Sequence, residues 1–358
     1  MSPRSLAVVL AALAALLPAV APSPAAAMLK GLQDDELLAS PEPAVRATFW
    51  RDAERAGVRR VRTLVRWTPQ WRVPDPADVV RVLQAGEQAR AIGARLLVGV
   101  YAPIARGRPS FRVTPAMIDR YGRFMAALAE ALRDAPVAAY LTYNEPNFRS
   151  MWPQRQAASW VKLSNAGYDA VKEVDPRIDV LVGETSSQAA AGGGSTNPGA
   201  FLRKALCLDA RWRRIPRDTA ACDRMLLADG VAIHTYDIRR PNPLAPGSHP
   251  DEWTAGNLAS VRRQLRALAR AGKLPARAAR NIHVTEYALR TTGPRAVPRR
   301  TAATYLRRAW TLARRHGVRS FTWYGLRDPR DTAHAWQSGL RGRGGTPRPV
   351  FSTFRRLR

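Results

Sequence analysis

Residues 138–147 read AAYLTYNEPN, a short apolar run that leads straight into a cluster of polar side chains. A run of this length, followed by turn-forming residues, is typical of a buried strand. Similar runs recur along the chain. The strands that we expect are Lys30–Leu32, Val58–Trp67, Arg95–Tyr101, Ala138–Tyr143, Val180–Gly183, Gly230–His234, Ile282–Thr285 and Ser320–Tyr324.

Amphipathic patterns with helical spacing separate most of these runs. We predict helices at Pro43–Ala56, Pro76–Ile92, Thr114–Arg133, Gln154–Val174, Trp253–Ala271 and Arg300–His316. Strands that alternate with helices, at roughly 40 to 47 residues per unit, indicate a parallel sheet. Eight such units favour an α/β fold, a single (β/α)8 TIM barrel, over an open sheet. No Gly-x-Gly-x-x-Gly follows an expected strand and no Gly-Lys-Ser/Thr loop occurs, which weakens a nucleotide-binding interpretation.

The chain is strongly basic. Its 358 residues include 57 Lys and Arg against 28 Asp and Glu, a formal net charge of +29, and 52 of the basic residues are Arg. This excess indicates either a polyanionic partner or arginine dispersed over solvated helix faces. We favour dispersal because the arginines are spread along the chain, and we expect no specific nucleic-acid partner. A hydrophobic fraction of 46% excludes an intrinsically disordered chain.

The first residues have the layout of a secretory signal peptide. A basic start precedes the apolar run Leu6–Val20, and Ala25–Ala27 offers an A-x-A cleavage site. The run is short for a membrane span and contains Pro18, although an uncleaved anchor is the alternative. We therefore expect residues 1–27 to be removed, and residues 28–358 to form a secreted, monomeric barrel domain without a transmembrane segment.

The two cysteines, Cys207 and Cys222, lie 15 positions apart in a polar stretch. Because export implies an oxidising compartment, we predict one disulfide that closes a surface loop, with about 3 kcal/mol of stabilisation. Two free thiols are the alternative. The histidines show no metal-ligand spacing, and two cysteines lack the further ligands of a zinc site. We therefore expect no metal and no cofactor.

A barrel of this class carries its chemistry at the carboxyl ends of its strands. Glu145 follows the expected fourth strand and Glu286 follows the seventh, so the two carboxylates face each other across the mouth. Cleavage of a glycosidic bond requires such a pair. One carboxyl group gives a proton to the leaving oxygen, and the other attacks or activates water, while their mutual repulsion favours one shared proton.

Several segments resemble one enzyme group in order and spacing. YLTYNEPNF resembles the Asn-Glu-Pro acid/base motif of glycoside hydrolase clan A, the retaining (β/α)8 glycosidases, and IHVTEYALRT resembles the nucleophile strand of that clan. VRTLVRW, HTY and FTWYGLRD resemble its second, sixth and eighth strands. The likeness is to families 5 and 39 and covers nearly all of residues 28–358. It implies a catalytic (β/α)8 domain that cleaves a β-linked glycan or glycoside.

The resemblance also implies roles for individual residues. Glu145 is the general acid/base, Glu286 is the nucleophile, and Asn144 holds the 2-hydroxyl of the sugar. The segment GVYAP, with Tyr101, stands where family 5 often has a histidine, and Tyr-Ala-Leu follows the nucleophile in place of the commoner Tyr/Phe-Gly. These two departures mean that the motifs do not identify the particular family or the sugar that it cleaves.

Four further residues complete the implied site. Arg62 lies below the nucleophile and keeps it ionised, and His234 lines the same pocket. Tyr236 hydrogen-bonds the nucleophile, and Trp323 stacks under the sugar in the reacting subsite. The partner that we expect is thus an oligo- or polysaccharide, neutral or acidic.

Weaker candidates surround this set. Glu184, at the end of the fifth strand, is a candidate to reach the cleft, and Asp34 and Asp35, after the first strand, are candidates to bind sugar hydroxyls. Three tryptophans in expected rim loops are candidates for outer subsites: Trp71, Trp152 and Trp336. The alternative to an enzyme is a non-catalytic barrel that binds a carbohydrate or a polyanion, for which both glutamates would be dispensable.

Overall fold

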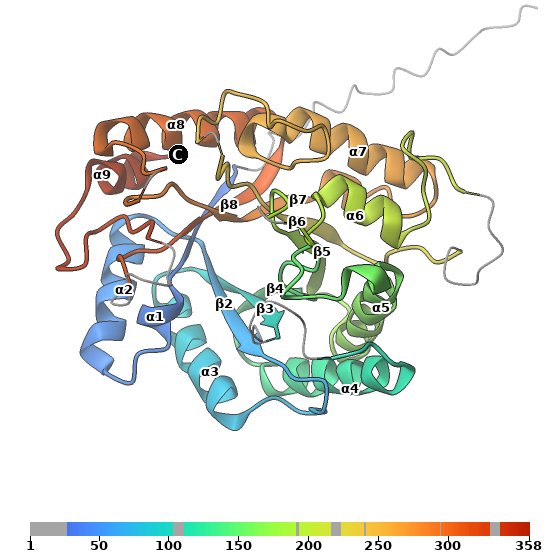
Figure 1. The fold of residues 1–358 in the computed structure, drawn as a ribbon. Coiled ribbons are helices and arrows are strands. Elements are labelled where there is room, and N and C mark those ends of the chain that lie inside the picture. The colour runs from blue at the N-terminus through green and yellow to red at the C-terminus, as the bar shows by residue number, and fades with distance from the viewer. Residues whose placement is uncertain are drawn as a thin grey trace, which may run out of the picture.

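The computed structural model describes residues 27–102, 111–190, 193–215, 223–239, 241–293, 295–329 and 337–358. Eight parallel strands follow one another around a closed barrel, in which β8 pairs with β1 (Figure 1). The predicted (β/α)8 fold is confirmed. The strands are β1 (Leu29–Gln33), β2 (Arg60–Arg66), β3 (Arg95–Tyr101), β4 (Val137–Leu141), β5 (Asp179–Thr185), β6 (Gly230–His234), β7 (Ile282–Tyr287) and β8 (Val318–Tyr324).

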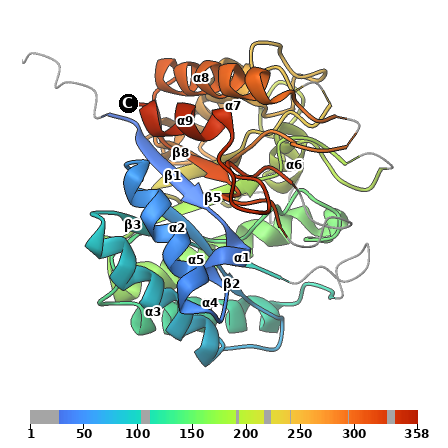
Figure 2. The ribbon, with the colours of Figure 1, turned by 90° about the vertical axis from the view of Figure 1, so that its left-hand side faces the viewer.

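Helices connect the strands and surround the barrel (Figures 1 and 2). The six predicted helices are present: α2 (Pro43–Arg55), α3 (Pro76–Ala91), α4 (Pro115–Ala131), α5 (Ala157–Val174), α7 (Leu258–Arg270) and α8 (Arg299–Arg315). Three short helices were not predicted: α1 (Asp35–Leu38), α6 (Pro198–Ala205) and α9 (Pro349–Arg356). Short 3-10 turns lie at Gln154–Gln156, Ala255–Asn257 and Ala278–Arg280.

Local sequence explains where the helices begin. The side chain of Asp75 accepts a hydrogen bond from the first turn of α3, and Thr114 does the same for α4. Proline occupies the first position of both helices, where its missing N–H costs nothing. Helix α7 begins five residues later than predicted, after the 3-10 turn Ala255–Asn257, and Trp253 before that turn is fully buried, with its indole donating to Oε1 of Gln264 at 2.8 Å. Among the described residues, none of the helices has the length and apolar character needed to cross a membrane.

The apolar core has two parts. A large cluster fills the layer between the strands and the surrounding helices. A small one fills the barrel itself and comprises Leu97, Ala139, Leu141, Leu181 and Ala232. Near the carboxyl ends of the strands the interior becomes polar, and Arg62 and Glu184 are fully buried there. Because buried charge is stable only when it is paired, this end of the barrel must carry a network of ion pairs.

The two ends of the described chain meet at the barrel. In Figure 2, α9 lies beside α8 and close to the start of β1. Nζ of Lys30, on β1, donates to the carbonyl oxygens of Ala56 at 2.6 Å and Arg355 at 3.2 Å. Arg341 forms two bonds to the carboxylate of Asp52, at 2.6 and 2.8 Å. These contacts tie the end of the chain to β1 and α2, beside the β1–β8 pairing that closes the ring.

Closure between β1 and β8 depends on a glycine. A Cβ added at Gly31 would lie 2.2 Å from Oγ1 and 3.0 Å from the backbone Cα of Thr322. We therefore expect Gly31→Ala to lower the free energy of unfolding by about 1–3 kcal/mol, as other overpacked cores do. Gly344→Ala is the matched control, since nothing lies within 4 Å of that added Cβ. Urea titrations of both variants test this expectation, and an equal loss in the control would contradict it.

Candidate active site

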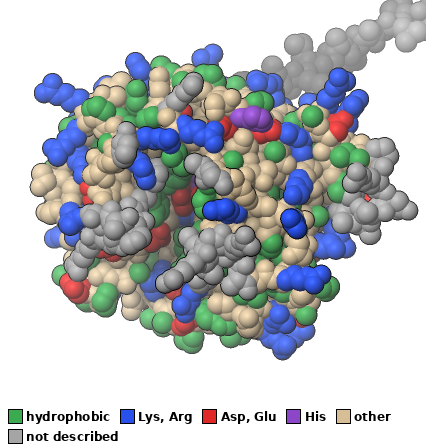
Figure 3. All heavy atoms as spheres, viewed as in Figure 1, with side chains coloured by type: hydrophobic (Ala, Val, Ile, Leu, Met, Phe, Trp, Pro, Cys, Tyr) green, Lys and Arg blue, Asp and Glu red, His purple; other side chains and the backbone are tan. Residues whose placement is uncertain are grey.

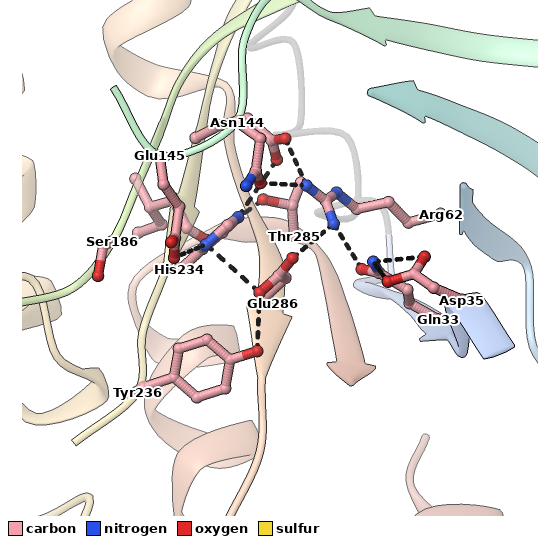
Figure 4. A network of polar contacts seen from close by, with 12 residues as sticks. Gln33, Asp35, Arg62, Asn144, Glu145, Ser186, His234, Tyr236, Thr285 and Glu286 are labelled. Carbon is pink, nitrogen blue, oxygen red and sulfur yellow. Dashed lines mark hydrogen bonds and ion pairs between the residues drawn. The ribbon is translucent and has the colours of Figure 1, made fainter. Parts of the chain in front are cut away.

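Side chains from several strand ends meet inside the mouth of the barrel (Figure 4). Arg62 comes from β2, His234 from the end of β6, and Glu286 from β7. Asn144 and Glu145 follow β4. With Tyr236, these are six of the seven residues that the sequence predicted for the site, and the structure brings them into one network.

The guanidinium of Arg62 is the centre of the network. Nη1 donates to Oε1 of Glu286 and to Oε1 of Gln33, both at 2.6 Å. Nη2 donates to Oε2 of Glu184 at 2.6 Å and to Oδ1 of Asn144 at 2.9 Å. Burial disfavours the charged guanidinium, but the charges of Glu184 and Glu286 outweigh it and raise the pKa of Arg62. Arg62 therefore stays a cation that holds both carboxylates.

Both oxygens of Glu286 are held. Oε1 faces Arg62, and Oε2 accepts a hydrogen bond from the hydroxyl of Tyr236 at 2.8 Å. Burial raises the pKa of Glu286 from its ordinary value, while the charges of His234 and Arg62 oppose that rise. The carboxylate thus has a fixed orientation and two cationic neighbours that favour its ionised form.

His234 lies between three carboxylates. Its Nδ1 is 2.9 Å from Oε1 of Glu145 and 3.4 Å from Oε2 of Glu286, and its Nε2 is 3.5 Å from Oε1 of Glu184. Burial favours the neutral ring, but the charges and hydrogen bonds of these glutamates outweigh it and raise the pKa of His234 to about 10. The imidazole is therefore a cation near neutral pH.

The backbone around two of the glutamates is strained. Glu145 and Glu184 have φ values of 47° and 44°, a region that costs a non-glycine residue about 1–3 kcal/mol. The amide of Glu145 donates to the carbonyl of Glu184 at 2.9 Å, and the side chain of Asn147 bonds the backbone of Ser186 in both directions. Strain that a fold holds in this way is typical of functional sites.

The two predicted carboxylates lie close together. One oxygen each of Glu145 and Glu286, and one nitrogen of His234, are all within 4.8 Å of one another. The side chain of Glu145 is 19% exposed and that of Glu286 is 10% exposed, so both reach the solvent-accessible mouth. The pair is therefore available to a ligand that enters from the open end of the barrel.

The same three groups have the spacing of a metal site. The donor chemistry does not suit a metal ion. A protonated imidazole has no lone pair to offer, and Oε1 of Glu286 already accepts from Arg62. A divalent cation would have to displace a proton and stand beside the guanidinium. The arrangement fits proton transfer between carboxyl groups better than metal binding.

The predicted role of Trp323 does not agree with its position. Its side chain is 1% exposed and packs against Tyr287 in the layer outside the barrel, with ring centroids 5.9 Å apart. Its indole donates to the carbonyls of Gly325 and Ser338 at 3.0 and 3.1 Å. Successive side chains of a strand point to opposite faces. Tyr324, the next residue, is partly exposed and lies opposite Gln33 in the barrel register, so it presents the aromatic ring on the inner face.

The acidic candidates after β1 and β5 divide into two kinds. Asp34 is structural, because its Oδ1 caps α1 at Leu37 and its Oδ2 accepts from the amides of Leu326 and Arg327. Glu184 and Asp35 belong to the site. Asp35 accepts from Nε2 of Gln33 at 3.0 and 3.1 Å, and Gln33 in turn contacts Arg62. Gln33 and Tyr324 were missed, although each is the last residue of its strand.

The tryptophan candidates do not form a common rim. Trp152 is fully buried against Tyr143, with centroids 5.3 Å apart, so it is a core residue. The guanidinium of Arg66 lies 4.9 Å from the centre of the Trp71 ring, which is partly exposed. Trp336 lies outside the described residues. Cys222 does so as well, so its pairing with Cys207, like the signal peptide, stays a prediction.

Solved glycoside hydrolases have a similar fold. A family 39 glycoside hydrolase from the gut symbiont Bacteroides cellulosilyticus WH2 matches with a TM-score of 0.63 and 20% identity, over 92% of this chain and 62% of that one. The exo-beta-1,4-mannosidase Op5Man5 from Opitutaceae bacterium strain TAV5 matches with a TM-score of 0.63 and 16% identity, over 92% and 59%. XacCel5A, solved in complex with cellopentaose, matches with a TM-score of 0.57 and 15% identity, over 92% and 99%.

These likenesses show the fold. The chain spans 62% and 59% of the first two of these proteins, and nearly all of the third. No protein-family model and no curated protein sequence matches it. The (β/α)8 fold that the motifs implied through their resemblance to glycoside hydrolase clan A is thus the fold observed.

Because Arg62 forms buried ion pairs, we predict that its removal lowers the free energy of unfolding by an amount that depends on pH. Arg62→Met leaves Glu184 and Glu286 without their cation, and we expect the free energy of unfolding at pH 7 to fall by about 3–5 kcal/mol. Burial opposes ionisation of Glu184, but Arg62 and His234 outweigh it and lower its pKa to about 2. That stabilisation is present above the ordinary pKa of about 4.5 and is lost as the pH falls towards 2. The difference in free energy of unfolding between wild type and Arg62→Met should therefore become smaller as the pH is lowered.

Unfolding titrations with guanidinium chloride at pH 7 and at pH 3 to 4 measure the difference in free energy of unfolding between wild type and Arg62→Met. Arg177→Met is the matched control, because Arg177 forms a solvent-screened, exposed pair with Asp175 and its removal should leave the free energy of unfolding almost unchanged. A loss in Arg62→Met that is as small as in the control, or that grows on acidification, would contradict the role of Arg62.

Proposed function

We propose that the protein is a retaining glycoside hydrolase that cleaves the O-glycosidic bonds of a β-linked glycan. The observation that carries the proposal is the pair Glu145 and Glu286, whose nearest oxygens lie within 4.8 Å across the barrel mouth. Retaining enzymes hold their two carboxyl groups about 5–5.5 Å apart, whereas inverting enzymes need about 6.5–9.5 Å to admit a water between them. The observed gap favours direct attack by a carboxylate.

The surroundings of the two glutamates support the roles that we propose for them. Glu286 is deeply set, has both oxygens fixed by Arg62 and Tyr236, and faces two cations that favour its ionised form. A fixed, ionised carboxylate is what a nucleophile requires. Glu145 lies on the loop after β4 and is the more exposed of the pair. It is the group placed to exchange protons with a leaving oxygen and later with water.

The reaction proceeds in two displacements. In the first, an oxygen of Glu286 forms a bond to the anomeric carbon while the bond to the leaving oxygen breaks, and Glu145 gives its proton to that oxygen. In the second, Glu145 takes a proton from water, the water oxygen bonds the anomeric carbon, and Glu286 is released. Oδ1 of Asn144 is occupied by Arg62, which leaves the amide NH2 as a donor for a sugar hydroxyl.

The compartment and the substrate are part of the same proposal. A cleaved signal peptide, residues 1–27, would deliver a monomeric enzyme to the exterior, where a disulfide between Cys207 and Cys222 is stable. Basic side chains are spread over the face drawn in Figure 3 and do not form one patch. The net charge of +29 suits acidic as well as neutral polysaccharides, so a substrate search must include both.

Substitution of either glutamate tests the proposal. We expect the purified protein to release reducing ends from a polymer in a panel of β-glucan, mannan, xylan, galactan and uronic-acid polymers. Glu145→Gln and Glu286→Ala should each lower the rate by ~10³-fold or more. Glu252→Gln is the matched control: Glu252 is a fully buried glutamate, more buried than either site glutamate, is paired with Arg239 at 2.7 Å, and its substitution should leave activity in place. Full activity in either site variant would favour the non-catalytic binding barrel.

The stereochemistry of the product provides a separate test. Because two displacements restore the original configuration, the first sugar released should have the anomeric configuration of the substrate. Proton NMR within the first minutes of the reaction, before mutarotation, distinguishes the two anomers. An inverted first product would contradict the double displacement even if both glutamates proved essential.

A further inference from the structure

We propose that Glu184 is a positioning residue for this reaction, and that its buried carboxylate holds His234 protonated between Glu145 and Glu286. The sequence marked Glu184 only as a weak candidate to reach the cleft. In the structure it is fully buried beneath the two reacting carboxylates, where it bonds Arg62 and lies close to His234. Its effect on rate rests on the proposed glycosidase function, whereas its effect on the imidazole does not.

A bulge aims Glu184 into the barrel. In the pairing of β5 with β6, Gly183 lies opposite Ala232 and Thr185 opposite Ile233, so that Glu184 is the extra residue between them. Such bulges re-aim a side chain and are common beside active sites. Gly183 has a φ of 104° and fits only without a side chain, because an added Cβ would lie 2.7 Å from the carbonyl of Ala232. The local backbone is thus built to deliver this carboxylate inward.

The carboxylate of Glu184 occupies a space beside Gly99 of β3. Glu184 is fully buried, with Oε2 at 2.6 Å from Nη2 of Arg62 and Oε1 at 3.5 Å from Nε2 of His234. On β3, Gly99 leaves the necessary room: an added Cβ would lie 3.4 Å from Oε2 of Glu184 and 2.8 Å from Leu64. Glu184 therefore bonds Arg62, the cation that orients Glu286, and lies in charge contact with His234, the cation that contacts Glu145.

The charges of the cluster balance only when Glu184 is ionised. Arg62 and protonated His234 supply two positive charges, and Glu184, Glu286 and Glu145 supply three negative ones. With one proton on Glu145, the state that the first displacement requires, the cluster is neutral. If the charge of Glu184 is removed, the same protonation state leaves a net positive charge in a buried site. The imidazolium would then lose its proton more readily.

Within the described part of the chain, few other ionisable groups face the cluster. Asp35, after β1, acts on Arg62 from the opposite side and is bonded by Gln33. Tyr236 and Tyr324 have pKa values raised well above the ordinary value, first by burial, and so remain neutral. Gly99 brings no charge from β3. Glu184 is therefore the carboxylate that sits against Nε2 of His234, on the side away from the reacting pair.

Two substitutions separate charge from shape. Glu184→Gln keeps the shape and removes the charge, whereas Glu184→Asp keeps the charge and shortens the side chain. The direct readout is an NMR titration of the full chain labelled with ¹⁵N-histidine, in which the signal that His234→Gln removes identifies His234. We expect Glu184→Gln to lower the titration midpoint of His234 by about 1–3 pH units, as loss of a close opposite charge does. Glu184→Asp and the control Glu252→Gln should leave it in place.

The pH profile extends the test to catalysis. On a glycoside that the wild type cleaves, the basic limb of kcat/KM should move to lower pH in Glu184→Gln and remain in place in Glu184→Asp. An aryl glycoside with a good leaving group needs little protonation of its leaving oxygen. Glu184→Gln should therefore cleave such a substrate at alkaline pH at a rate close to that of the wild type. A residue that only filled space would show the opposite order, with the shortened variant the more damaged.

The outcomes distinguish the two proposals. An unchanged titration of His234 in folded Glu184→Gln would overturn the role of Glu184. If that variant does not fold, loss of the imidazole proton in Glu184→Asp overturns it, and retention of the proton supports it. If His234 responds as expected but no glycoside is cleaved even by the wild type, the contact stands and the proposed function fails.

Discussion

The rest of the site depends on the burial of one guanidinium. Arg62 projects from the middle of β2 into the barrel and is fully removed from solvent. A charge in that position must be neutralised by close partners, and carboxylates from β5 and β7 supply them. The neutral groups Gln33 and Asn144 complete its hydrogen bonds from the ends of β1 and β4. A single cation thus fixes side chains from four other strands relative to one another.

This organisation separates rigid groups from adjustable ones. Glu184 and Arg62 are fully buried, and Glu286 is tied by Arg62 and Tyr236, so the lower part of the network is pre-formed. Glu145 lies above it on a loop and is the most exposed of the three carboxylates. Pre-organised charge stabilises a transition state without reorganising during the reaction. A group that must pass a proton in both directions needs access to solvent, and Glu145 has it.

The sequence was sufficient for the barrel and for most of the site. Short apolar runs gave the strands. Closure of the barrel brings their carboxyl ends together, and with them Asn144, Glu145, His234, Tyr236 and Glu286, while Arg62 reaches the same place from the middle of β2. Short elements such as α6 and α9 carry too few turns to show a clear helical period. They were therefore missed.

The errors have a local geometric cause. Trp323 was placed in the site through the resemblance of FTWYGLRD to the eighth strand of the clan, but alternation along β8 turns its side chain outward and turns Tyr324 inward. Glu184 was predicted only as a weak candidate, because the direction of its side chain depends on a bulge in β5 and the sequence pattern gives no sign of that bulge. A second bulge shifts the register of β7 between Val284 and Glu286. Strand ends can be located from sequence more easily than the direction of each side chain.

The most direct test of the account is to identify the residue that bonds the sugar. A 2-deoxy-2-fluoro glycoside with a good leaving group slows the second displacement, because the fluorine destabilises the positive charge that develops on the sugar ring. Incubation of the protein with a set of such glycosides, followed by mass spectrometry of proteolytic peptides, would locate any covalent adduct. The account predicts one adduct, on Glu286, and its absence from Glu286→Ala. An adduct on another carboxylate, or none with a glycoside that the protein demonstrably cleaves, would contradict it.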